Sequence, residues 1–374
     1  MALRWLTAGE SHGPGLVGII TGLPAGLEIW PGRIDAELLR RQRGAGRSKR
    51  QQIERDTATI IAGVRHGKTI GSPVAILIEN KDHQNWKEAM SSDPVEDESV
   101  FPPAYPRPGH ADLAGMIKWG FDDARNVLER ASGRSTAMTV ALGAVCRTYL
   151  EQHGIYTGSR IIEYGGVRIF DIEESMVPTR AEIGDDPSML TSLHELENEQ
   201  QKKINEIVER ARESGETLGG VVQAVSAHVP PGLGSCVLPD ERLDSRIAAA
   251  AMGIPGVKAV ELGAGMSQAG IGGKNAHDRF ALSDDPSHEP WYGRLSNLAG
   301  GIEGGITNGE PVCVTAWMKP LATVNPPLPS IDTRAKEAIQ PESSERSDVS
   351  AVESMGVVLE AVVALELARA HLDM

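Results

Sequence analysis

The sequence predicts an α+β protein that folds as one large domain, and three observations support this prediction. The 374 residues are 40% hydrophobic and 24% charged, a composition that can bury a large core. Short β-branched segments alternate with helical patterns, and no low-complexity linker divides the chain. A turn pattern, G-x-T-x-G-x-[PV]-V, occurs at residues 67–74, 215–222 and 305–312, each time before an apolar strand. This repeat predicts related halves within one architecture, with chance similarity of glycine-rich turns as the alternative.

The strands are predicted from apolar alternation, β-branched residues and flanking glycine or proline. They cover residues 16–23, 57–64, 74–79 and 257–262. The helices are predicted from the spacing of apolar residues. They cover residues 34–43, residues 112–149 with a break at Gly133, and a charged segment at about 192–213. Three long polar or basic stretches, near 40–50, 81–107 and 325–350, are predicted to be active-site loops.

The composition excludes several classes of function. A net charge of −14 and a pI near 5.2 argue against general affinity for nucleic acid or for an anionic membrane, so an anion site must be a local exception. The cysteines Cys146, Cys236 and Cys313 are far apart, with no CxxC pair and no histidine at ligand spacing. This spacing predicts neither a metal site nor a disulfide framework. With no signal peptide and no long apolar run, a cytoplasmic protein is expected.

Two glycine-rich segments are similar to nucleotide-binding loops but lack the full pattern. Residues 63–69 end in Gly-Lys-Thr after a predicted strand, yet the first glycine of a P-loop would have to stand at Ala62. A structural turn is therefore the better interpretation of this segment. After the predicted strand 257–262, Gly263 and Gly265 begin a dinucleotide fingerprint that the position of Gly270 breaks.

The run RRQRGAGRSKR, from Arg40 to Arg50, is strongly basic in an acidic chain. Such a run is often a solvated face, and a nucleic-acid module would need interleaved aromatic residues, which this run lacks. Its two glycines can bend the chain so that Arg47 and Arg50 converge on one anion, because guanidinium groups bind phosphate or carboxylate bidentately. Further arginines stand near other glycine-rich turns, at Arg107, Arg125, Arg130, Arg134 and Arg346. The whole set predicts a small substrate with several negative charges.

Arg130 and Arg134 are four residues apart and are expected to share one helix face. Like charges at this spacing repel each other unless an anion or an acid lies beside them. Glu129 or Asp122 is the expected structural partner, and a bound anion is the alternative.

Two histidines lie beside glycine in turns that constrain their backbone. His12 is part of Gly-Glu-Ser-His-Gly, and His110 is part of Arg-Pro-Gly-His-Ala-Asp. A ring in such a turn can protrude into a cleft and donate a proton near neutral pH. Two surface turn histidines without a function are the alternative.

Motifs along the whole chain, in order, resemble the chorismate synthase family. The first are GESHGPGLVGIITGLPAG from Gly9, RRQRGAGRSKRQQIERD from Arg40, GVRHGKTIGSPVAILIEN from Gly63 and RPGHADLAGMIKWGFDDARNVLERASGRSTA from Arg107. The later ones are SGETLGGVV from Ser214, PPGLGSCV from Pro230, LDSRIAAAAMGIPGVKAVELGAG from Leu243, NLAGGIEGGITNGEPV from Asn297, MKPLATV from Met318 and ERSDVSAV from Glu345. Such an ordered series is far more specific than a single glycine fingerprint.

The resemblance implies a β-α-β sandwich with internal pseudo-symmetry, in which residues 1–374 form one catalytic domain, and a homotetramer. It implies a lyase of the shikimate pathway that removes phosphate and a ring proton from 5-enolpyruvylshikimate 3-phosphate in a 1,4-anti elimination, giving chorismate. The family requires reduced FMN (FMNH2), although no net redox change occurs. The sequence leaves open whether this enzyme reduces its flavin with NADPH or depends on an external flavin reductase.

The resemblance also implies roles for individual residues. His12 matches the proton donor to the leaving phosphate, His110 the histidine that protonates or holds the reduced flavin, and Asp348 the acid that acts with the flavin on the ring proton. The implied flavin contacts are Arg130, Ala131, Ser132, Pro255, Gly256, Gly304, Lys319, Pro320, Leu321, Ala322, Thr323 and Arg346. The implied substrate contacts are Ser11, Arg47, Arg50, Arg107 and Arg134. Arg41 and Arg47 also match positions assigned to a reduced nicotinamide nucleotide, although for Arg47 we favour the substrate role.

Two departures from the family pattern concern the flavin and the segment around Asp348. Ala322 stands where members commonly have serine, so a hydroxyl near the flavin phosphate is missing. Glu353 stands where members commonly have proline, and its negative charge is expected to weaken anion binding or to alter the rigidity of the loop. A flavin oxidoreductase with net hydride transfer would share the flavin site and is the alternative function.

Overall fold

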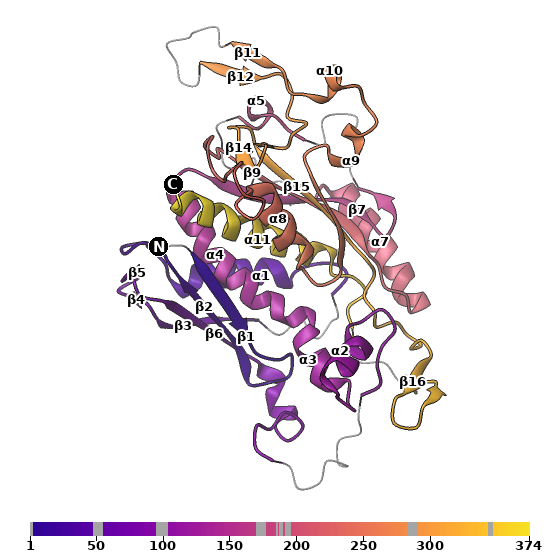
Figure 1. Ribbon diagram of the computed structural model, residues 1–374. Coiled ribbons are helices and arrows are strands. Elements are labelled where there is room, and N and C mark those ends of the chain that lie inside the picture. The colour runs from indigo at the N-terminus through magenta and orange to yellow at the C-terminus, as the bar shows by residue number, and fades with distance from the viewer. Residues whose placement is uncertain are drawn as a thin grey trace.

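Two antiparallel sheets enclose a layer of helices in the computed structural model, so the chain forms a β-α-β sandwich (Figure 1). The structure describes residues 3–47, 55–94, 104–169, 177–184, 186, 190, 196–282, 291–342 and 347–374. The predicted α+β fold in a single domain is confirmed.

The first sheet has the strand order β1-β2-β6-β3, and the second has the order β10-β15-β9-β7-β8. The strands of the first sheet are β1 (Arg4–Ala8), β2 (Gly15–Thr21), β3 (Ala58–Ala62) and β6 (Val74–Glu79). Those of the second are β7 (Tyr156–Tyr164), β8 (Val167–Arg168), β9 (Gly220–Ala227), β10 (Val257–Leu262) and β15 (Val312–Met318). Within each sheet every neighbouring pair is antiparallel.

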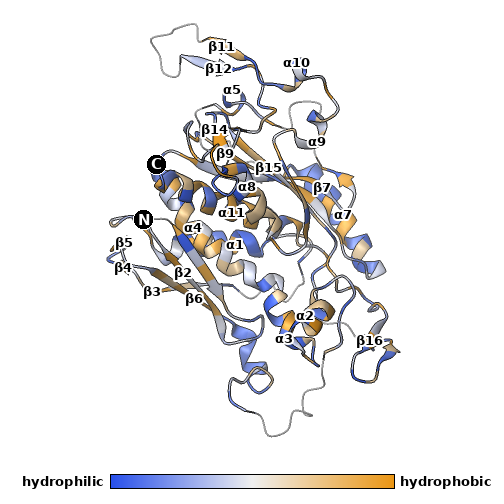
Figure 2. Ribbon diagram, viewed as in Figure 1, coloured by the Kyte–Doolittle hydropathy of each residue, from blue (hydrophilic) through white to orange (hydrophobic). Residues whose placement is uncertain are grey.

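The helical layer consists of α1 (Pro31–Gln42), α4 (Thr136–Gln152), α8 (Leu243–Met252) and α11 (Val352–Leu372). Helix α11 is buried on nearly all sides, as expected for a helix that is apolar around its circumference. It packs closely on α4, since a Cβ at Gly143 would lie 2.4 Å from the Cβ of Ala361. Hydrophobic residues run along the strands of both sheets and the helices between them (Figure 2).

The two halves of the chain repeat one topology. The order of elements is β1, β2, α1, β3, β6, α4 in the first half and β7, β9, α8, β10, β15, α11 in the second. The equivalent strands are also neighbours in the same order, β1-β2-β6-β3 in one sheet and β7-β9-β15-β10 in the other. The predicted internal pseudo-symmetry is therefore confirmed.

Two of the three turn motifs are structurally equivalent. Thr69 donates its hydroxyl to Pro24 O at 2.6 Å and accepts from Leu27 N at 3.0 Å. The corresponding bonds in the second half run from Thr307 to Pro230 O at 2.7 Å and to Thr307 from Leu233 N at 2.9 Å. The third motif differs, because the hydroxyl of Thr217 donates to Leu321 O at 2.6 Å, in the segment after β15. The repeat thus consists of two equivalent turns and one that resembles them in sequence alone.

The predicted strands and helices occur with adjusted ends. The strands 74–79 and 257–262 are β6 and β10 without change, and residues 16–23 contain β2. The predicted strand 57–64 ends at Ala62 because Gly63, with φ +85°, leads into the hairpin of β4 (Val64–Arg65) and β5 (Lys68–Thr69). Segment 63–69 is therefore a structural turn, as predicted. Helix α1 begins at Pro31, earlier than expected, since proline is favoured in a first helical turn.

The predicted helix 112–149 is divided twice. Helix α2 (Asp112–Trp119) ends at Gly120, which has a φ of +71°, and α3 (Arg125–Ala131) is followed by the 3-10 turn η3 (Gly133–Ser135) before α4 begins. The break at Gly133 is confirmed, whereas the break at Gly120 was not predicted. In the charged segment, α7 (Asn198–Ser214) confirms the helix, and residues 192–195 lie outside the described residues.

Shorter elements occupy the long connections. They are η1 (Lys81–Asn85), α5 (Arg180–Ile183), α9 (Gly265–Gln268), α10 (Gly273–Ala276), β11 (Phe280–Leu282), β12 (Tyr292–Arg294), β13 (Ile302–Glu303), β14 (Ile306–Thr307), β16 (Ser330–Asp332) and β17 (Glu337–Ile339). The predicted loop 325–350 thus contains the β16–β17 hairpin. Among the described residues, no helix is both long enough and apolar enough to cross a membrane.

Candidate active site

Two groups of predicted site residues lie in equivalent connections of the two halves. Arg107 belongs to the β6–α4 connection and Thr323 to the β15–α11 connection, and Arg107 NH1 donates to Thr323 Oγ1 at 3.1 Å. The turn after α1 reaches the β15–α11 connection as well, because Arg47 NH1 lies 2.7 Å from Asp348 Oδ2. Segments far apart in the sequence therefore meet here.

His12 lies in the β1–β2 turn and is bonded to a buried carboxylate. Its Nδ1 lies 2.9 Å from Glu129 Oε1, and its backbone N–H donates to Glu129 Oε2 at 2.8 Å. Burial raises the pKa of Glu129, but the hydrogen bonds from His12, and then the charge of Arg125 at 3.2 Å, hold this pKa below its ordinary value. An ionised Glu129 orients the imidazole and can stabilise positive charge on it, while Nε2 is the nitrogen that can reach a ligand.

His110 has the same arrangement with Asp112, a carboxylate that is fully buried. Its Nδ1 bonds Asp112 Oδ1, and Arg107 Nε donates to Asp112 Oδ2 at 3.0 Å. Burial raises the pKa of Asp112, but the hydrogen bonds from His110 and Arg107 outweigh this and lower the pKa. The two candidate acid–base histidines are therefore each supported by a carboxylate and an arginine.

A cluster of arginines, of which Arg41 and Arg47 are buried, lies near the His12 turn, since Arg134 Nε donates to Asn80 Oδ1 and Asn80 Nδ2 donates to Gly13 O. Asp56 Oδ2 lies 2.6 Å from Arg134 NH1 and 3.8 Å from Arg41 NH1. Arg47 pairs with a second carboxylate, that of Asp348. Burial lowers the pKa of Arg41 to about 9, and the charges of Arg47 and Arg134 act in the same direction. Among the described residues, these ion pairs of the three guanidinium groups use two carboxylates, and the third acid near Arg47, Glu353, has a raised pKa. Such a cluster of guanidinium groups can bind an anionic ligand.

The expected pairing of Arg130 and Arg134 with Glu129 or Asp122 is wrong. Arg130 instead donates to backbone oxygens at the end of β1 and in the turn that follows it, and Arg134 pairs with Asp56. The reason is that α3 ends before Arg134, so the two arginines do not share a helix face, and Glu129 is already engaged by His12.

Lys319 and Ala322, in the segment 319–323, lie beside Gly109, which precedes His110. Lys319 Nζ bonds Gly109 O, and Lys319 N donates to Gly256 O at 3.0 Å. Gly109 has a φ of +78°, and a Cβ there would meet only Lys319 Nζ at 3.6 Å and the Cβ of Ala322 at 4.0 Å. The structure thus brings the predicted cofactor contacts at 255–256 and 319–323 together with Arg107 and His110.

The remaining predicted contacts fall into three groups. Ser132 Oγ donates to Ser11 Oγ at 3.3 Å, which places the end of α3 beside the His12 turn. Gly304 turns the β13–β14 hairpin, which forms a bridge with Gly234 and not with the segments described above. Arg50 and Arg346 lie outside the described residues.

Sequence reasoning missed the side chains that hold the histidines and arginines. Asp112 could have been found, because it stands two residues after His110 in a constrained turn. Glu129 was considered only as an arginine partner, and Asp56 and Asn80 carry no local signal, since they reach Arg134 through the fold at 2.6 Å and 2.9 Å.

Glu353 links the basic turn to the first turn of α11. Its half-buried carboxylate accepts from Ala45 N at 2.7 Å and from Tyr164 OH at 3.0 Å, and a Cβ at Gly44 would lie 2.8 Å from its Cδ. Burial raises the pKa of Glu353, and these hydrogen bonds and the charge of Arg47 offset this effect only in part. The contacts support the expectation that this residue affects the rigidity of the loop.

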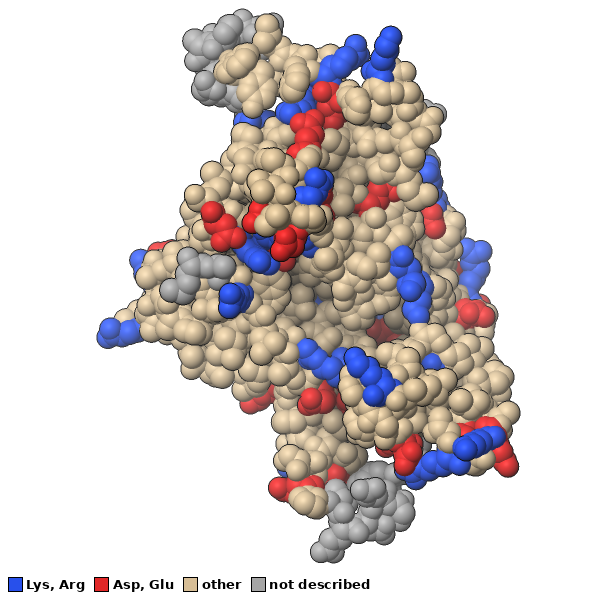
Figure 3. Space-filling model, in the orientation of Figure 1, with Lys and Arg blue, Asp and Glu red and all other residues tan. Residues whose placement is uncertain are grey.

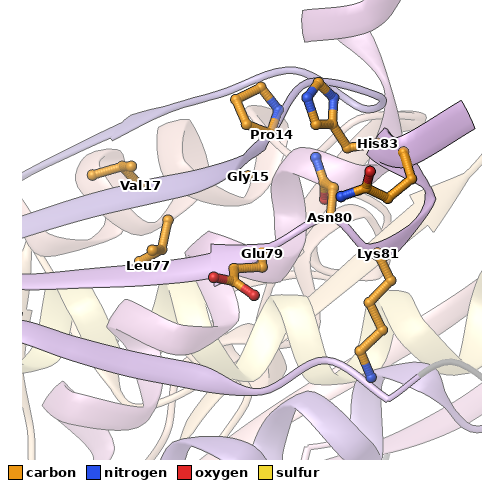
Figure 4. Close-up of a pocket in the computed structure, with 9 residues that line it drawn as sticks. Pro14, Gly15, Val17, Leu77, Glu79, Asn80, Lys81 and His83 are labelled. Carbon is orange, nitrogen blue, oxygen red and sulfur yellow. The ribbon is translucent and has the colours of Figure 1, made fainter. Parts of the chain in front are cut away.

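The surface near this region has mixed charge and one further hollow. On the face shown in Figure 3, Lys and Arg side chains are interspersed with Asp and Glu and do not merge into one basic surface. A cavity of about 430 Å³ lies beside the His12 turn, lined by Pro14, Asn80, Lys81 and His83 among others (Figure 4).

Two histidine–carboxylate pairs and a cluster of arginines are the arrangement expected of an enzyme that performs acid–base chemistry on an anionic substrate. The chorismate synthase family model matches residues 3–372. The chain is 44% identical over 380 residues to chorismate synthase of Aquifex aeolicus (strain VF5) and 45% identical over 379 residues to that of Thermobifida fusca (strain YX). These alignments cover 99% of this chain and 93% and 94% of the relatives.

A crystal structure of chorismate synthase matches the fold with a TM-score of 0.76 at 36% identity, covering 100% of this chain and 92% of that one. The chain therefore belongs to the chorismate synthase family. It is an enzyme, a carbon–oxygen lyase of the shikimate pathway.

Proposed function

We propose that this enzyme converts 5-enolpyruvylshikimate 3-phosphate to chorismate by 1,4-anti elimination, with reduced FMN and no net redox change. The reaction breaks one C–O bond, releases phosphate, removes a ring proton and forms a C=C bond. The observation that carries this proposal is the pairing of His12 with Glu129 and of His110 with Asp112, together with the arginine cluster near the His12 turn. A substrate with one phosphate and two carboxylates suits such a cluster of guanidinium groups.

The residues around Gly109 fit a phosphate-bearing flavin. Lys319 and Arg107 supply positive charge, Thr323 supplies a hydroxyl, and the open Gly109 backbone admits a ligand in close approach. We propose that these residues, the remaining implied contacts at 130–132, 255–256, Gly304 and 320–322, and Arg346 hold the cofactor. Bound reduced FMN would supply electron density as the phosphate leaves and take it back as the proton departs.

We assign the proton transfers to three side chains. His12 donates a proton from Nε2 to the leaving phosphate while Glu129 stabilises its ring. His110, oriented by Asp112, protonates or holds the reduced flavin. Asp348, held by Arg47, acts with the flavin on the ring proton.

Anion binding is assigned to Ser11, Arg47, Arg50, Arg107 and Arg134. Arg41 and Arg47 are only 6% and 8% exposed, so we propose that both act on the anionic ligands mainly through their charge. The loops near 40–50, 81–107 and 325–350 would form the walls of this site. The proposed reaction holds whether NADPH or an external reductase reduces the flavin. We propose that the enzyme acts in the cytoplasm.

The outer face of the first sheet supports the proposed homotetramer. Leu6, Ile19 and Ile61 are 70%, 42% and 56% exposed, and Leu6 and Ile19 are paired across strands. On the second sheet, Val225 and Cys313 of the equivalent strands are instead covered by Val177 and Leu190 and their neighbours. We propose that a second copy of the chain covers the first sheet. Light scattering should then show a smaller assembly for Ile19→Glu than for the control Met266→Glu.

An anaerobic assay tests the proposed reaction. The protein is mixed with chemically reduced FMN and 5-enolpyruvylshikimate 3-phosphate, and chorismate absorbance, phosphate release and flavin oxidation are followed together. Equal amounts of chorismate and phosphate, with the flavin still reduced, are expected. Oxidation of nicotinamide nucleotide in proportion to product would instead indicate an oxidoreductase, and flavin binding without product would contradict the assigned reaction.

A further inference from the structure

The backbone of the His12 turn is held by the residues that follow β6. Asn80 Nδ2 donates to Glu10 O at 3.0 Å and to Gly13 O at 2.7 Å. His83 Nδ1 lies 2.9 Å from His12 O, in the middle of the same turn. Because donors from a separate segment satisfy these three carbonyl groups, the turn cannot shift without breaking contacts to residues 80–83.

The side chain of His12 is held by the same segment. The indole of Trp86 lies against the imidazole, with ring centroids 4.2 Å apart and an interplanar angle of 36°. The guanidinium of Arg125 lies over the Trp86 ring at 4.8 Å and bonds Glu129, which in turn bonds His12 Nδ1. Trp86, Arg125 and Glu129 therefore form a closed set of contacts around one ring.

We propose that His83 and Trp86 are positioning residues for His12, a proposal that rests on its assigned role as proton donor. A ring bonded only through Nδ1 to Glu129 could tilt about that bond and swing Nε2 away from the phosphate oxygen. Stacking on Trp86 limits this tilt, and the bond from His83 fixes the backbone from which the ring extends. A misplacement of about 1 Å can cost about a hundredfold in rate, so contacts of this kind have a measurable effect on turnover.

A cavity adjoins His83. His83 lines this cavity together with Pro14 (Figure 4) and bonds the backbone of His12. The contact of His83 with His12 is through the backbone oxygen only, so the two histidines can be tested independently. Asparagine at position 83 can place a side-chain N–H where Nδ1 now lies, whereas phenylalanine keeps a ring and loses the donor.

The test compares Trp86→Ala, Trp86→Phe, His83→Phe and His83→Asn, with Trp30→Ala, at a half-exposed residue before α1, as the control. In the anaerobic assay, kcat should fall about 10- to 100-fold in Trp86→Ala and His83→Phe, with KM changed less than about twofold. Trp86→Phe and His83→Asn should recover most of kcat. Circular dichroism establishes that each variant is folded.

Nuclear magnetic resonance supplies a signature independent of activity. The ring C–H signal of His12, identified by its absence in His12→Gln, should lose the ring-current shift of Trp86 in Trp86→Ala and keep most of it in Trp86→Phe. Wild-type kcat in both Trp86→Ala and His83→Phe, or an unmoved His12 signal in Trp86→Ala, would overturn the proposal. Full activity in His12→Gln would refute the donor role itself, whereas activity lost there and kept in Trp86→Ala would refute only the positioning role.

Discussion

Replacing Glu129 by glutamine tests the carboxylate behind His12. Glutamine has nearly the same shape and keeps an oxygen for Nδ1, so the change removes the negative charge without creating a cavity. The pair is 2.9 Å apart and Glu129 is 3% exposed, so solvent screens its charge weakly. A hydrogen bond to a charged group contributes about 1.5–3 kcal/mol and a neutral one about 0.5–1.5 kcal/mol. The difference of about 1–2 kcal/mol predicts a loss of about 5- to 30-fold in kcat for Glu129→Gln.

The loss should appear in kcat and not in KM, because positive charge develops on His12 during proton transfer and Glu129 need not touch the substrate. Steady-state kinetics under anaerobic conditions measure both constants, with Glu199→Gln on the exposed face of α7 as the matched control. An unchanged kcat, or a loss confined to KM, would refute the argument that Glu129 stabilises charge on His12.

The same variant makes a prediction about acid stability. The pKa of Glu129 is lowered in the folded protein from its ordinary value of 4.5. A lowered pKa stabilises the fold above the unfolded value, and this stabilisation is lost as the pH falls through the folded value. The wild type should therefore lose more unfolding free energy than Glu129→Gln as the pH falls below 4.5, measured by urea denaturation. Parallel curves for the two proteins would contradict the lowered pKa.

Three further predictions concern other parts of the site and the fold. His110→Ala and Asp348→Asn should each lower turnover by about a hundredfold or more while circular dichroism and melting temperature show a folded protein, and wild-type turnover would remove the residue from the mechanism. Glu353→Gln should gain stability relative to the wild type as the pH rises above 4.5, because a raised pKa in the folded protein makes ionisation of Glu353 oppose folding. Urea midpoints at several pH values test this. A relative loss of stability with rising pH would contradict the raised pKa. Thr69→Val and Thr307→Val should each lower the unfolding free energy by about 2 kcal/mol, because each removes the hydroxyl that bonds one backbone N–H and one backbone C=O. Urea midpoints that differ widely between the two variants would argue against the equivalence of the two turns.

The sequence predicted those parts of the fold that depend on local pattern. The strand 74–79 was placed without error because it is a short apolar run rich in β-branched residues and a proline precedes it. The break at Gly120 was missed because its left-handed conformation shows only once the chain is folded. The equivalence of the two turns needed the structure, since Thr217 fits the same motif and makes a different bond.

The candidate site was predictable in its charges but not in its pairings. The basic run from Arg40 to Arg50, in a chain of net charge −14, predicted an anion site. Which acid balances which arginine could not be predicted, because Asp56 and Arg134 are brought together by the fold alone. Glu353 appeared in the sequence to be an added charge in a loop, whereas its carboxylate accepts hydrogen bonds from the Ala45 amide and the Tyr164 hydroxyl.

The internal repeat explains why a single site arises from two similar halves. Helices α4 and α11 are equivalent and pack on each other, and each begins directly after a connection that carries site residues. Their amino-terminal ends carry partial positive charge, which adds to that of Arg41, Arg47 and Arg134. The two connections differ in chemistry, however, because the first carries His110 and the second carries Asp348. Under the proposed function, the duplicated helices supply a common positive field for the anion, and the two connections supply the histidine assigned to the flavin and the acid assigned to the ring proton.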